Sequence, residues 1–266
     1  MTDIDMKPRA IRGASSLFTD IGKHYMEESY FDRSGLLLGP EVMRRLATAR
    51  VILFGTGGVG SWCAEGLIRT GLRHLTIVDS DTVAPSNVNR QLPATSSTIG
   101  QAKTEVLRRR LLDINPDACV TARCERFNAQ TAHTFALEEF DYVIDAIDSV
   151  ADKALLILRA TSARGVTLLS SMGAARKIDP QQVRVAEFWQ VKGCPLAAAL
   201  RSRFKRTGEF PARKFKAVFS PEIRRNTREG AGANGSLVHI TAVWGMTLVS
   251  LLIRHLADTT VHPSAK

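Results

Sequence analysis

The stretch RVILFGTGGVG, at residues 50–60, constrains the fold more than any other part of the chain. An apolar run of strand length precedes four glycines in the pattern GxGGxG, and a segment with helical spacing follows. Glycines at such a turn let backbone N–H groups approach a phosphate at the N-terminus of a helix. Asp79 ends the next apolar run, where a carboxylate can bind ribose hydroxyls. We therefore predict a nucleotide site, for NAD or ATP, at Gly55, Gly57, Gly58, Gly60 and Asp79.

Strand-like and helix-like segments alternate from residue 50 to residue 173. Such alternation, with continuous apolar strands, predicts an α/β fold with a Rossmann-like, doubly wound and mostly parallel sheet. We expect strands at residues 50–55, 74–79, 118–127, 141–148 and 166–173, and helices at residues 60–71, 100–114, 129–140 and 149–165. We divide the chain into an N-terminal extension with a helix (1–45), a nucleotide-binding core (46–175) and a C-terminal part (176–266).

The C-terminal part breaks the alternation. We expect a strand pair that leaves the parallel sheet at residues 177–190, a long loop or short helices at residues 201–228, and a closing helix at residues 237–256. The closing segment lacks Asp, Glu, Lys and Arg from Leu237 to Ile253, which is just under the length of a membrane span. His239, three hydroxyl residues and Gly245 dilute it, so a helix buried in the domain is the preferred interpretation and a membrane-associated helix the alternative.

Charge is concentrated in one segment of the chain. The formal net charge is +10, and residues 201–228, with ten basic and two acidic residues, carry +8 of it. This concentration indicates a polyanionic partner such as nucleic acid. The four cysteines form no CxxC pair, which argues against a disulfide framework and a four-thiolate zinc site. With no apolar leader at the N-terminus, we expect a cytoplasmic protein.

The residues that follow Asp79 favour ATP over NAD. Arg90 and Lys103 are two cations that suit a triphosphate, where negative charge develops as pyrophosphate leaves. Asp145 and Asp148 end a buried strand, at the edge where such sheets bind ligands, and Asp148 is placed to hold Mg²⁺. The candidate nucleotide-binding residues of this region are Asp79, Asp81, Asn87, Gln91 and Lys103.

Four stretches, ARVILFGTGGVGS, LTIVDSDTVAPSNVNRQ, IGQAKTEV and DYVIDAIDS, resemble the adenylating proteins of the ThiF/MoeB/HesA type, within the ubiquitin-activating-enzyme-like superfamily. The resemblance implies that the glycine loop holds ATP, that Asp79 binds the ribose and that Asp148 binds Mg²⁺. It further implies that Asn87, Arg90, Gln91 and Lys103 contact phosphates and promote adenylation. An arginine of such proteins reaches into the neighbouring subunit's site, which makes Arg33 a catalytic candidate and implies a homodimer.

The absence of CxxC and the presence of Ser149 point away from the members that activate carrier proteins. The stretches KIDPQQVRVAEFW, GCPLAAALRSRFKR and AVFSPE resemble the group of this superfamily that dehydrates threonylcarbamoyladenosine in tRNA. The resemblance implies adenylation of the threonyl carboxylate by ATP·Mg²⁺, followed by ring closure and release of AMP. This route needs no protein nucleophile and therefore no role for Cys194, and the charge of residues 201–228 agrees with a tRNA partner.

Three alternatives stay open at this point. The first is activation of a ubiquitin-like or sulfur-carrier protein, with Cys194 as a possible acceptor and a sulfur-relay protein as a possible partner. The second is a non-catalytic partner protein with a decayed nucleotide site, against which Arg90, Lys103 and Asp148 argue. The third is an NAD-linked dehydrogenase, against which the NVNRQ and GQAK stretches argue.

Overall fold

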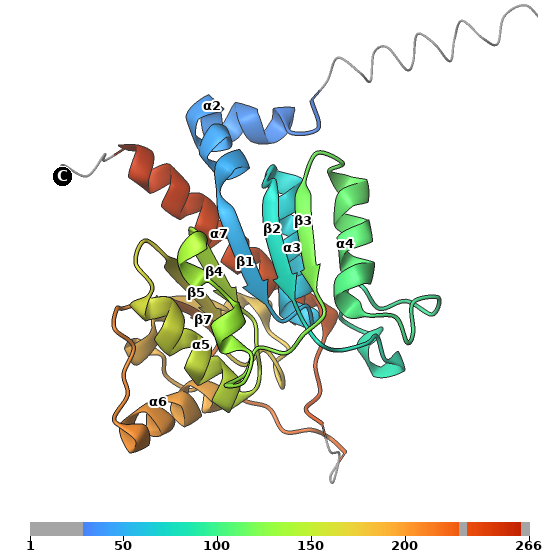
Figure 1. The fold of residues 1–266 in the computed structure, drawn as a ribbon. Coiled ribbons are helices and arrows are strands. Elements are labelled where there is room, and N and C mark those ends of the chain that lie inside the picture. Colours follow the sequence, from blue (N-terminus) through green and yellow to red (C-terminus); the bar gives the residue numbers. More distant parts are fainter. Residues whose placement is uncertain (1–28, 229–232, 262–266) are drawn as a thin grey trace, which may run out of the picture.

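The computed structural model describes residues 29–228 and 233–261, with side chains up to residue 258. One seven-stranded sheet runs through it in the order β3-β2-β1-β4-β5-β7-β6 (Figure 1). Its strands are β1 (Arg50–Phe54), β2 (His74–Val78), β3 (Cys119–Arg123), β4 (Tyr142–Asp145), β5 (Thr167–Ser171), β6 (Arg184–Glu187) and β7 (Lys216–Phe219). Every neighbouring pair is parallel except β6 with β7, which is antiparallel. The predicted Rossmann-like, mostly parallel α/β fold is confirmed.

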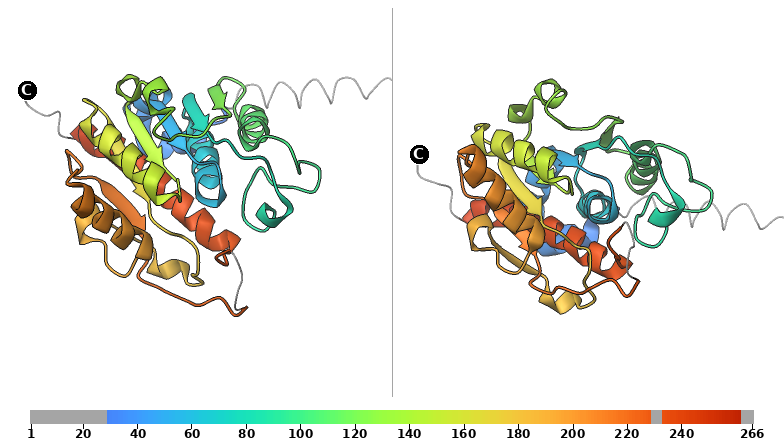
Figure 2. Two further views of the ribbon diagram at one scale, coloured as in Figure 1. Left: turned by 60° about the horizontal axis from the view of Figure 1, so that its bottom comes forward. Right: turned by 90° about the horizontal axis from the view of Figure 1, so that it is seen from below.

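Helices cover both faces of this sheet (Figures 1 and 2). The helices are α2 (Asp32–Thr48), α3 (Gly58–Thr70), α4 (Lys103–Ile114), α5 (Val150–Ser162), α6 (Pro195–Thr207) and α7 (Val238–Val261). One apolar cluster joins α2, α3, α4 and α7 to the sheet, and a second joins α5 and α6 to it. Each face of the sheet therefore has its own buried core, as a doubly wound fold requires.

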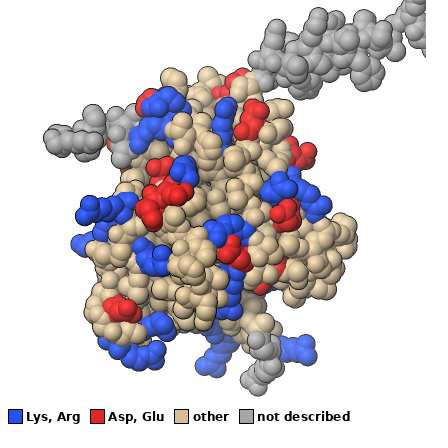
Figure 3. Space-filling model, in the orientation of Figure 1, with Lys and Arg blue, Asp and Glu red and all other residues tan. Residues whose placement is uncertain are grey.

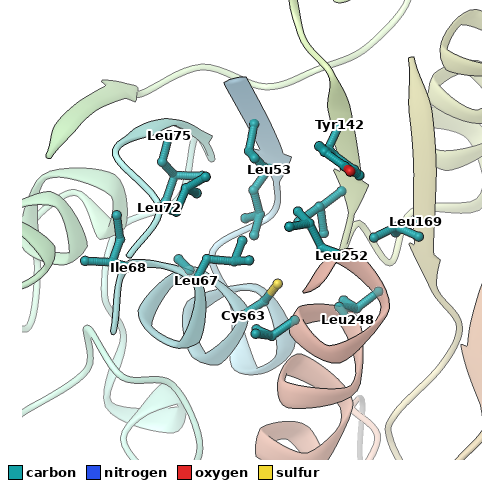
Figure 4. Packing of buried hydrophobic residues seen from close by; sticks show 14 of the residues in the cluster. Leu53, Cys63, Leu67, Ile68, Leu72, Leu75, Tyr142, Leu169, Leu248 and Leu252 are labelled. Atoms are coloured by element: carbon teal, nitrogen blue, oxygen red, sulfur yellow. The ribbon is translucent and has the colours of Figure 1, made fainter. Parts of the chain in front are cut away.

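Two glycines bring α3 and α7 close together. A Cβ at Gly66 would lie 2.8 Å from the Val249 side chain, and a Cβ at Gly245 would lie 2.6 Å from the Val59 carbonyl oxygen. Cys63 and Leu67 of α3 lie beside Leu248 and Leu252 of α7 in the same core (Figure 4). The glycine inside the closing helix is therefore a packing residue, because a side chain there would push the two helices apart.

The closing helix is a core element of the described fold. The stretch Val238–Asp258 is long and apolar enough to cross a membrane, with a mean hydropathy of 1.5. However, 50% of this apolar stretch is buried inside the protein. Ile240, Trp244, Leu248 and Leu252 are fully buried against the rest of the chain. This arrangement agrees with the preferred interpretation from the sequence, a helix packed inside the domain.

The prediction of a helix at residues 129–140 is wrong. Two short 3-10 turns, η2 (Ala132–Thr134) and η3 (Leu137–Glu139), stand in its place. The Asn128 side chain accepts hydrogen bonds from the backbone N–H groups of Gln130 and Thr131, and the Thr131 hydroxyl donates to the Arg126 carbonyl. Such local side-chain bonds offer the backbone an alternative to helical hydrogen bonds.

Two expectations for the C-terminal part are also wrong. Residues 177–190 hold one strand, β6, which pairs with β7 at the edge of the main sheet rather than forming a strand pair outside it. The basic segment, expected as a long loop or short helices, contains instead most of the 13-residue helix α6 and the strand β7, which is parallel to β5. Both parts of the chain, before and after residue 175, thus contribute strands to one sheet. The segment boundaries of the proposed division stay a prediction.

The N-terminal helix is longer than expected. The stretch GPEVMRRLATA, at residues 39–49, predicts the helical part of this region, but α2 begins at Asp32 and is kinked at Gly39, whose φ is +75°, and Pro40. Residues 1–28 of the expected N-terminal extension lie outside the described residues.

Candidate active site in the cleft between β1 and β4

A cleft of about 790 Å³ opens at the carboxyl ends of the strands. Strand order reverses between β1 and β4, because β1 continues to β2 and β3 on one side and β4 continues to β5 on the other. Loops that follow such a switch point diverge and leave a crevice, which is where open α/β sheets bind ligands. The cleft is lined by the loops after β1, β2, β4 and β5, together with the chain around residues 222–241.

The four glycines of the loop after β1 have two different functions. A Cβ at Gly55, whose φ is +89°, would lie 2.7 Å from the Ala146 carbonyl oxygen, and a Cβ at Gly60 would overlap the Gly55 carbonyl. These two glycines let the loop pack on itself and on the β4 loop. Gly57 and Gly58 line the cleft at the N-terminus of α3. Their backbone is thus accessible to a phosphate at the positive end of the helix.

The loop after β2 brings three of the predicted residues together. Asp79 accepts hydrogen bonds from the Thr56 N–H at 2.7 Å and the Thr56 hydroxyl at 3.0 Å, and its second oxygen accepts from the Asp81 N–H at 2.9 Å. A carboxylate offers about four acceptor positions, so Asp79 retains capacity for a ribose hydroxyl. The ammonium group of Lys103, which is 5% exposed, lies 2.7 Å from Asp81 Oδ2.

The segment from residue 84 to residue 92 presents Asn87, Arg90 and Gln91 to the same cleft. The side chain of Asn87 closes its own turn by accepting from the Ala84 N–H, and the Arg90 guanidinium donates to the Ser86 carbonyl and the Asn89 side chain. Gln91 is buried, and its Oε1 has no hydrogen-bond partner among the described residues. A buried polar atom without a partner is costly, and this one lies in the wall of the cleft, where a bound ligand can satisfy it.

Asp148 and Asp145 have separate positions. Asp145 is fully buried, paired with Lys153 at 2.8 Å and bonded to the Ser170 hydroxyl at 2.6 Å, so it is not available to a ligand. Asp148 is exposed in the cleft and makes no hydrogen bond or ion pair with any other described residue. The structure therefore leaves Asp148 as the acidic residue of this loop that can reach a ligand.

The donor set fits Mg²⁺ carried by a nucleotide rather than a metal held by the protein alone. No group of three or more His, Cys, Asp or Glu side chains that could hold a metal ion occurs among the described residues. Mg²⁺ bound with ATP takes one or two carboxylates, phosphate oxygens and water, and demands no larger protein set. Asp148 supplies one such carboxylate beside the glycine loop.

Arg33 lies apart from the other predicted residues. It is exposed on α2 and is not among the residues that line the cleft. Within one subunit, the structure therefore brings together the predicted residues Gly55, Gly57, Gly58, Asp79, Asp81, Asn87, Arg90, Gln91, Lys103 and Asp148, with Gly60 directly beneath the loop.

Several residues of the cleft were missed by the sequence reasoning. At the end of β3, Arg126 Nε and Nη2 donate to Asp152 at 2.9 and 2.6 Å. This hydrogen bond with Asp152 raises the pKa of Arg126, and the charges of Asp81 and Asp148 also contribute. The rule that ligands bind at carboxyl ends of strands would have indicated Arg126, because it lies three residues after the end of β3.

Arg176, Lys177 and Glu222 also line the cleft. Lys177 and Glu222 lie in two stretches that resemble the dehydratase group, but the sequence alone did not mark any of the three as a site residue. Burial lowers the pKa of Lys177, an effect opposed by nearby Cys194 and Glu222 and reinforced by Arg176. Burial alone would raise the pKa of Glu222, but hydrogen bonds from Arg224 and from the N–H groups of Asp179 and Ile178 lower it to about 2. This part of the cleft is therefore basic on balance, with its one carboxylate engaged in the protein.

Cys194 is buried, 3% exposed, and precedes α6 as its N-cap residue. It does not line the cleft. This position fits a packing residue in the second apolar cluster, of which Cys194 is a member.

The cations of the basic segment, residues 201–228, include some that bond to other residues and some at the exposed end of α6. Arg213 donates to the carbonyls of Ala160 in the last turn of α5 and of Val166 just before β5, and Arg224 pairs with Glu222. Lys205 and Arg206 are exposed in the last turn of α6. Basic side chains gather along the lower edge of the molecule, where α6 lies (Figure 3).

This sheet order, with a glycine loop at the switch point and cations around the cleft, defines a nucleotide-binding protein of the ThiF type, and residues 31–266 match the ThiF family. The chain belongs to this family. It is 36% identical over 242 residues to the tRNA threonylcarbamoyladenosine dehydratase of Haemophilus influenzae, a match that covers 85% of this chain and 92% of the relative. The enzyme of the same name from Bacillus subtilis is 36% identical over 206 residues, covering 76% of this chain and 80% of the relative.

Solved structures of a dehydratase are also similar to this chain. The crystal structure of Escherichia coli tRNA N6-threonylcarbamoyladenosine dehydratase, TcdA, in complex with ATP superposes with a TM-score of 0.79 at 32% identity. The complex of that protein with AMP superposes with a TM-score of 0.80. Each match covers 87% of this chain and 95% of the other. The nucleotides in those crystals are the substrate and the product expected of an adenylation reaction.

Proposed function

We propose that the protein is an ATP-dependent dehydratase that converts N6-threonylcarbamoyladenosine of tRNA, next to the anticodon, into its cyclic form. The observation that carries the proposal is the cleft at the switch point, where Gly57 and Gly58, Asp79, Gln91 and Lys103 converge. The matches to dehydratases from three bacteria support the choice of substrate. Because the proposed substrate is tRNA, the reaction belongs in the cytoplasm.

The reaction converts a poor electrophile into a good one. An oxygen of the threonyl carboxylate attacks the α-phosphorus of ATP, the bond to pyrophosphate breaks, and an acyl-adenylate forms. The carbamoyl group then attacks the acyl carbon, closes a ring and releases AMP, and it loses one proton to solvent. The net change in the nucleoside is the loss of one water, whose oxygen leaves in AMP.

Different residues of the cleft act on different parts of ATP in this reaction. Gly57 and Gly58 hold phosphates on backbone N–H groups, and Asp79 holds the ribose. Arg90 and Lys103 stabilise the charge that develops on the phosphorus and on the departing pyrophosphate, an effect worth roughly 3–4 kcal/mol per donor in comparable sites. Asp148 would hold Mg²⁺, which neutralises phosphate charge when it is bound.

The exposed face of α6 supports tRNA binding. Lys205 and Arg206 are exposed there. Trp189 and Phe210, 38% and 53% exposed, lie beside each other with ring centroids 6.1 Å apart, and Trp189 also contacts Phe204 of α6. Cations release counterions from phosphates, and exposed rings stack with unpaired bases, so both features favour a single-stranded loop of tRNA.

A homodimer would place Arg33 of one subunit at the active-site cleft of the other. Leu36 and Leu37 are each 85% exposed and Tyr30 is 74% exposed, all close to Arg33 at the start of the chain that the structure describes. Large apolar side chains that lie exposed together mark a contact surface. A second copy of the chain would cover them and would bring its Arg33 to the neighbouring cleft.

The direct test uses ATP, Mg²⁺ and tRNA that carries the threonylcarbamoyl group, followed by mass spectrometry of the nucleosides. We expect a nucleoside lighter by one water, with AMP formed in equal amount. If the nucleoside is unchanged while ATP–pyrophosphate exchange responds to a sulfur-carrier protein, the activity is instead that of a carrier-protein activator.

A further inference from the structure

Arg176 has an unusual backbone conformation. It is the one described residue other than glycine with a positive φ, +59°. A left-handed conformation is unfavourable for a residue with a Cβ and persists only where the surroundings impose it. Here two backbone hydrogen bonds do so, from the Arg176 N–H to the Gly235 carbonyl at 2.8 Å and from the Arg224 N–H to the Arg176 carbonyl at 3.1 Å.

The side chain of Arg176 is partly buried in the lining of the cleft. It makes no hydrogen bond or ion pair with another residue in the part of the chain that the structure describes. Arginine carries five N–H donors in a planar fork, which matches a carboxylate with two parallel hydrogen bonds. A strained residue with an unpaired guanidinium in a cleft is therefore a candidate for ligand binding.

The next residue adds a second cation at the same position. Lys177 is 4% exposed, lines the cleft, and donates from Nζ to the Glu222 carbonyl. An ammonium group has three N–H donors, so two have no partner among the described residues. The Glu222 carboxylate cannot neutralise it by direct contact, because it accepts from Arg224 at 2.7 Å and from the Ile178 and Asp179 N–H groups at 3.0 Å each.

One short loop links the Arg176 and Lys177 pair to the adenylation residues. The Asn89 side chain donates to the Ser236 carbonyl at 2.8 Å, and Gly235, the preceding residue, accepts from Arg176. Two residues of one short loop thus connect the Arg90 segment to the Arg176 segment. An anion held by Arg176 and Lys177 would lie next to the phosphate chemistry rather than on a remote surface.

We propose that Arg176 and Lys177 form the subsite that binds the threonyl carboxylate of the modified nucleoside and holds it for attack on ATP. This inference rests on the proposed function and names the residues that recognise its substrate. Two cations at one position select a nucleoside that carries the anionic group over unmodified adenosine. The anion is lost on adenylation, so the pair positions the substrate and releases the acyl-adenylate for ring closure.

The test compares two anticodon stem-loop RNAs that differ in one group. One carries N6-threonylcarbamoyladenosine, and the other carries the same group with its carboxylate replaced by the neutral carboxamide. Affinity for each is measured with the full-length protein loaded with a non-hydrolysable ATP analogue. All phosphate contacts are common to the two RNAs, so the ratio of the affinities reports on contacts to the carboxylate alone.

We expect the wild-type protein to bind the carboxylate RNA about tenfold or more tightly than the carboxamide RNA, the effect of one or two charge-assisted hydrogen bonds. Arg176→Gly and Lys177→Gln should each reduce this ratio severalfold, and Arg176→Lys should restore part of it. Arg164→Ala removes an exposed arginine outside the cleft and should leave the ratio unchanged. Glycine adopts the left-handed conformation freely, so Arg176→Gly should melt no lower than wild type.

Two results would overturn the proposal. A wild-type ratio that persists in both Arg176→Gly and Lys177→Gln would show that neither side chain contacts the carboxylate. An equal loss of affinity for both RNAs would assign the pair to a tRNA phosphate. If the wild-type protein neither binds nor dehydrates the carboxylate RNA, the proposed function itself fails, and this outcome is distinct from the other two.

Discussion

The carboxylate of Asp145 and the ammonium group of Lys153 lie 2.8 Å apart, and neither side chain is exposed. Together they hold the backbone of Ile147 on both sides of its Cα, because the Ile147 N–H donates to Asp145 at 3.1 Å and the Ile147 carbonyl accepts from Lys153 at 2.9 Å. Asp148 is the next residue along the chain. The buried pair therefore sets the direction in which the β4 loop presents its exposed carboxylate to the cleft.

Breaking this pair should be strongly destabilising. Lys153→Met leaves the Asp145 carboxylate buried without its partner, which costs about 3–5 kcal/mol of unfolding free energy. Denaturant unfolding measures the loss, and the Mg²⁺ concentration for half-maximal dehydration should rise in the fraction that folds. The double variant Asp145→Asn/Lys153→Met removes both charges and should regain part of the stability. A single variant as stable as wild type, with unchanged Mg²⁺ dependence, would contradict this account.

The two kinds of glycine in the loop should respond differently to alanine. Gly60→Ala places a methyl group against the Gly55 carbonyl and should prevent stable folding. At Gly57 the nearest atom to a new Cβ is the Gln91 Nε2 at 3.7 Å, so Gly57→Ala should fold. It should nonetheless bind ATP at least tenfold more weakly, because the methyl group occupies the space next to the phosphates. Calorimetry of ATP binding and thermal melts separate these effects, and equal behaviour of the two variants would contradict the assignment.

Arg33 should act across the dimer interface. Arg33→Ala and Arg90→Ala should each lower the turnover number by about 100-fold or more. When the two inactive variants are mixed and allowed to exchange subunits, half of the dimers are mixed and each has one complete site. About a quarter of the wild-type activity should then return. No recovery after verified subunit exchange would mean that Arg33 acts within its own subunit or has no role.

The end of α6 should contribute electrostatic affinity for tRNA. Lys205→Ala/Arg206→Ala should lower the slope of log affinity against log salt by about 1.5, if each side chain contacts one phosphate. Arg213→Ala is the matched control, because Arg213 lies in the same basic segment but bonds to carbonyls in the last turn of α5 and just before β5. That control should lower stability and leave the slope unchanged. Equal slopes for the double variant and wild type would exclude this face from the tRNA interface.

The sheet was predictable because its strands are marked locally. The expected strands at residues 50–55 and 74–79 differ from β1 and β2 by one residue at one end, since each apolar run stops at a polar or glycine residue. The helix α6 was not predicted, because its many basic residues hide the apolar pattern in the sequence. The pattern is nevertheless present: Ala197, Leu200 and Phe204 lie three and four residues apart and form the buried face of the helix. The strand β7 was missed for a similar reason, because its apolar run, residues 217–219, is short and directly follows Lys214 and Lys216.

The two halves of the cleft differ in how well the sequence predicts which residues line them. The glycine loop and its neighbours follow their own strands directly, so the end of each strand predicts where they lie. Arg176 and Lys177 reach the cleft through hydrogen bonds with residues about fifty positions away, such as Arg224 and Gly235. The end of β5 predicts that the following loop lies near the cleft. No local pattern encodes the distant hydrogen bonds that fix Arg176 and Lys177 in this loop, so their positions required the structure.

Isotope transfer tests the central claim, adenylation of the substrate carboxylate, most directly. The threonylcarbamoyl group is prepared with ¹⁸O in both carboxylate oxygens, incorporated in tRNA and incubated with the protein, ATP and Mg²⁺. We predict that one labelled oxygen appears in the phosphate of AMP and that the other remains as the carbonyl oxygen attached to the ring of the product. Label found in water or in inorganic phosphate, with none in AMP, would contradict it.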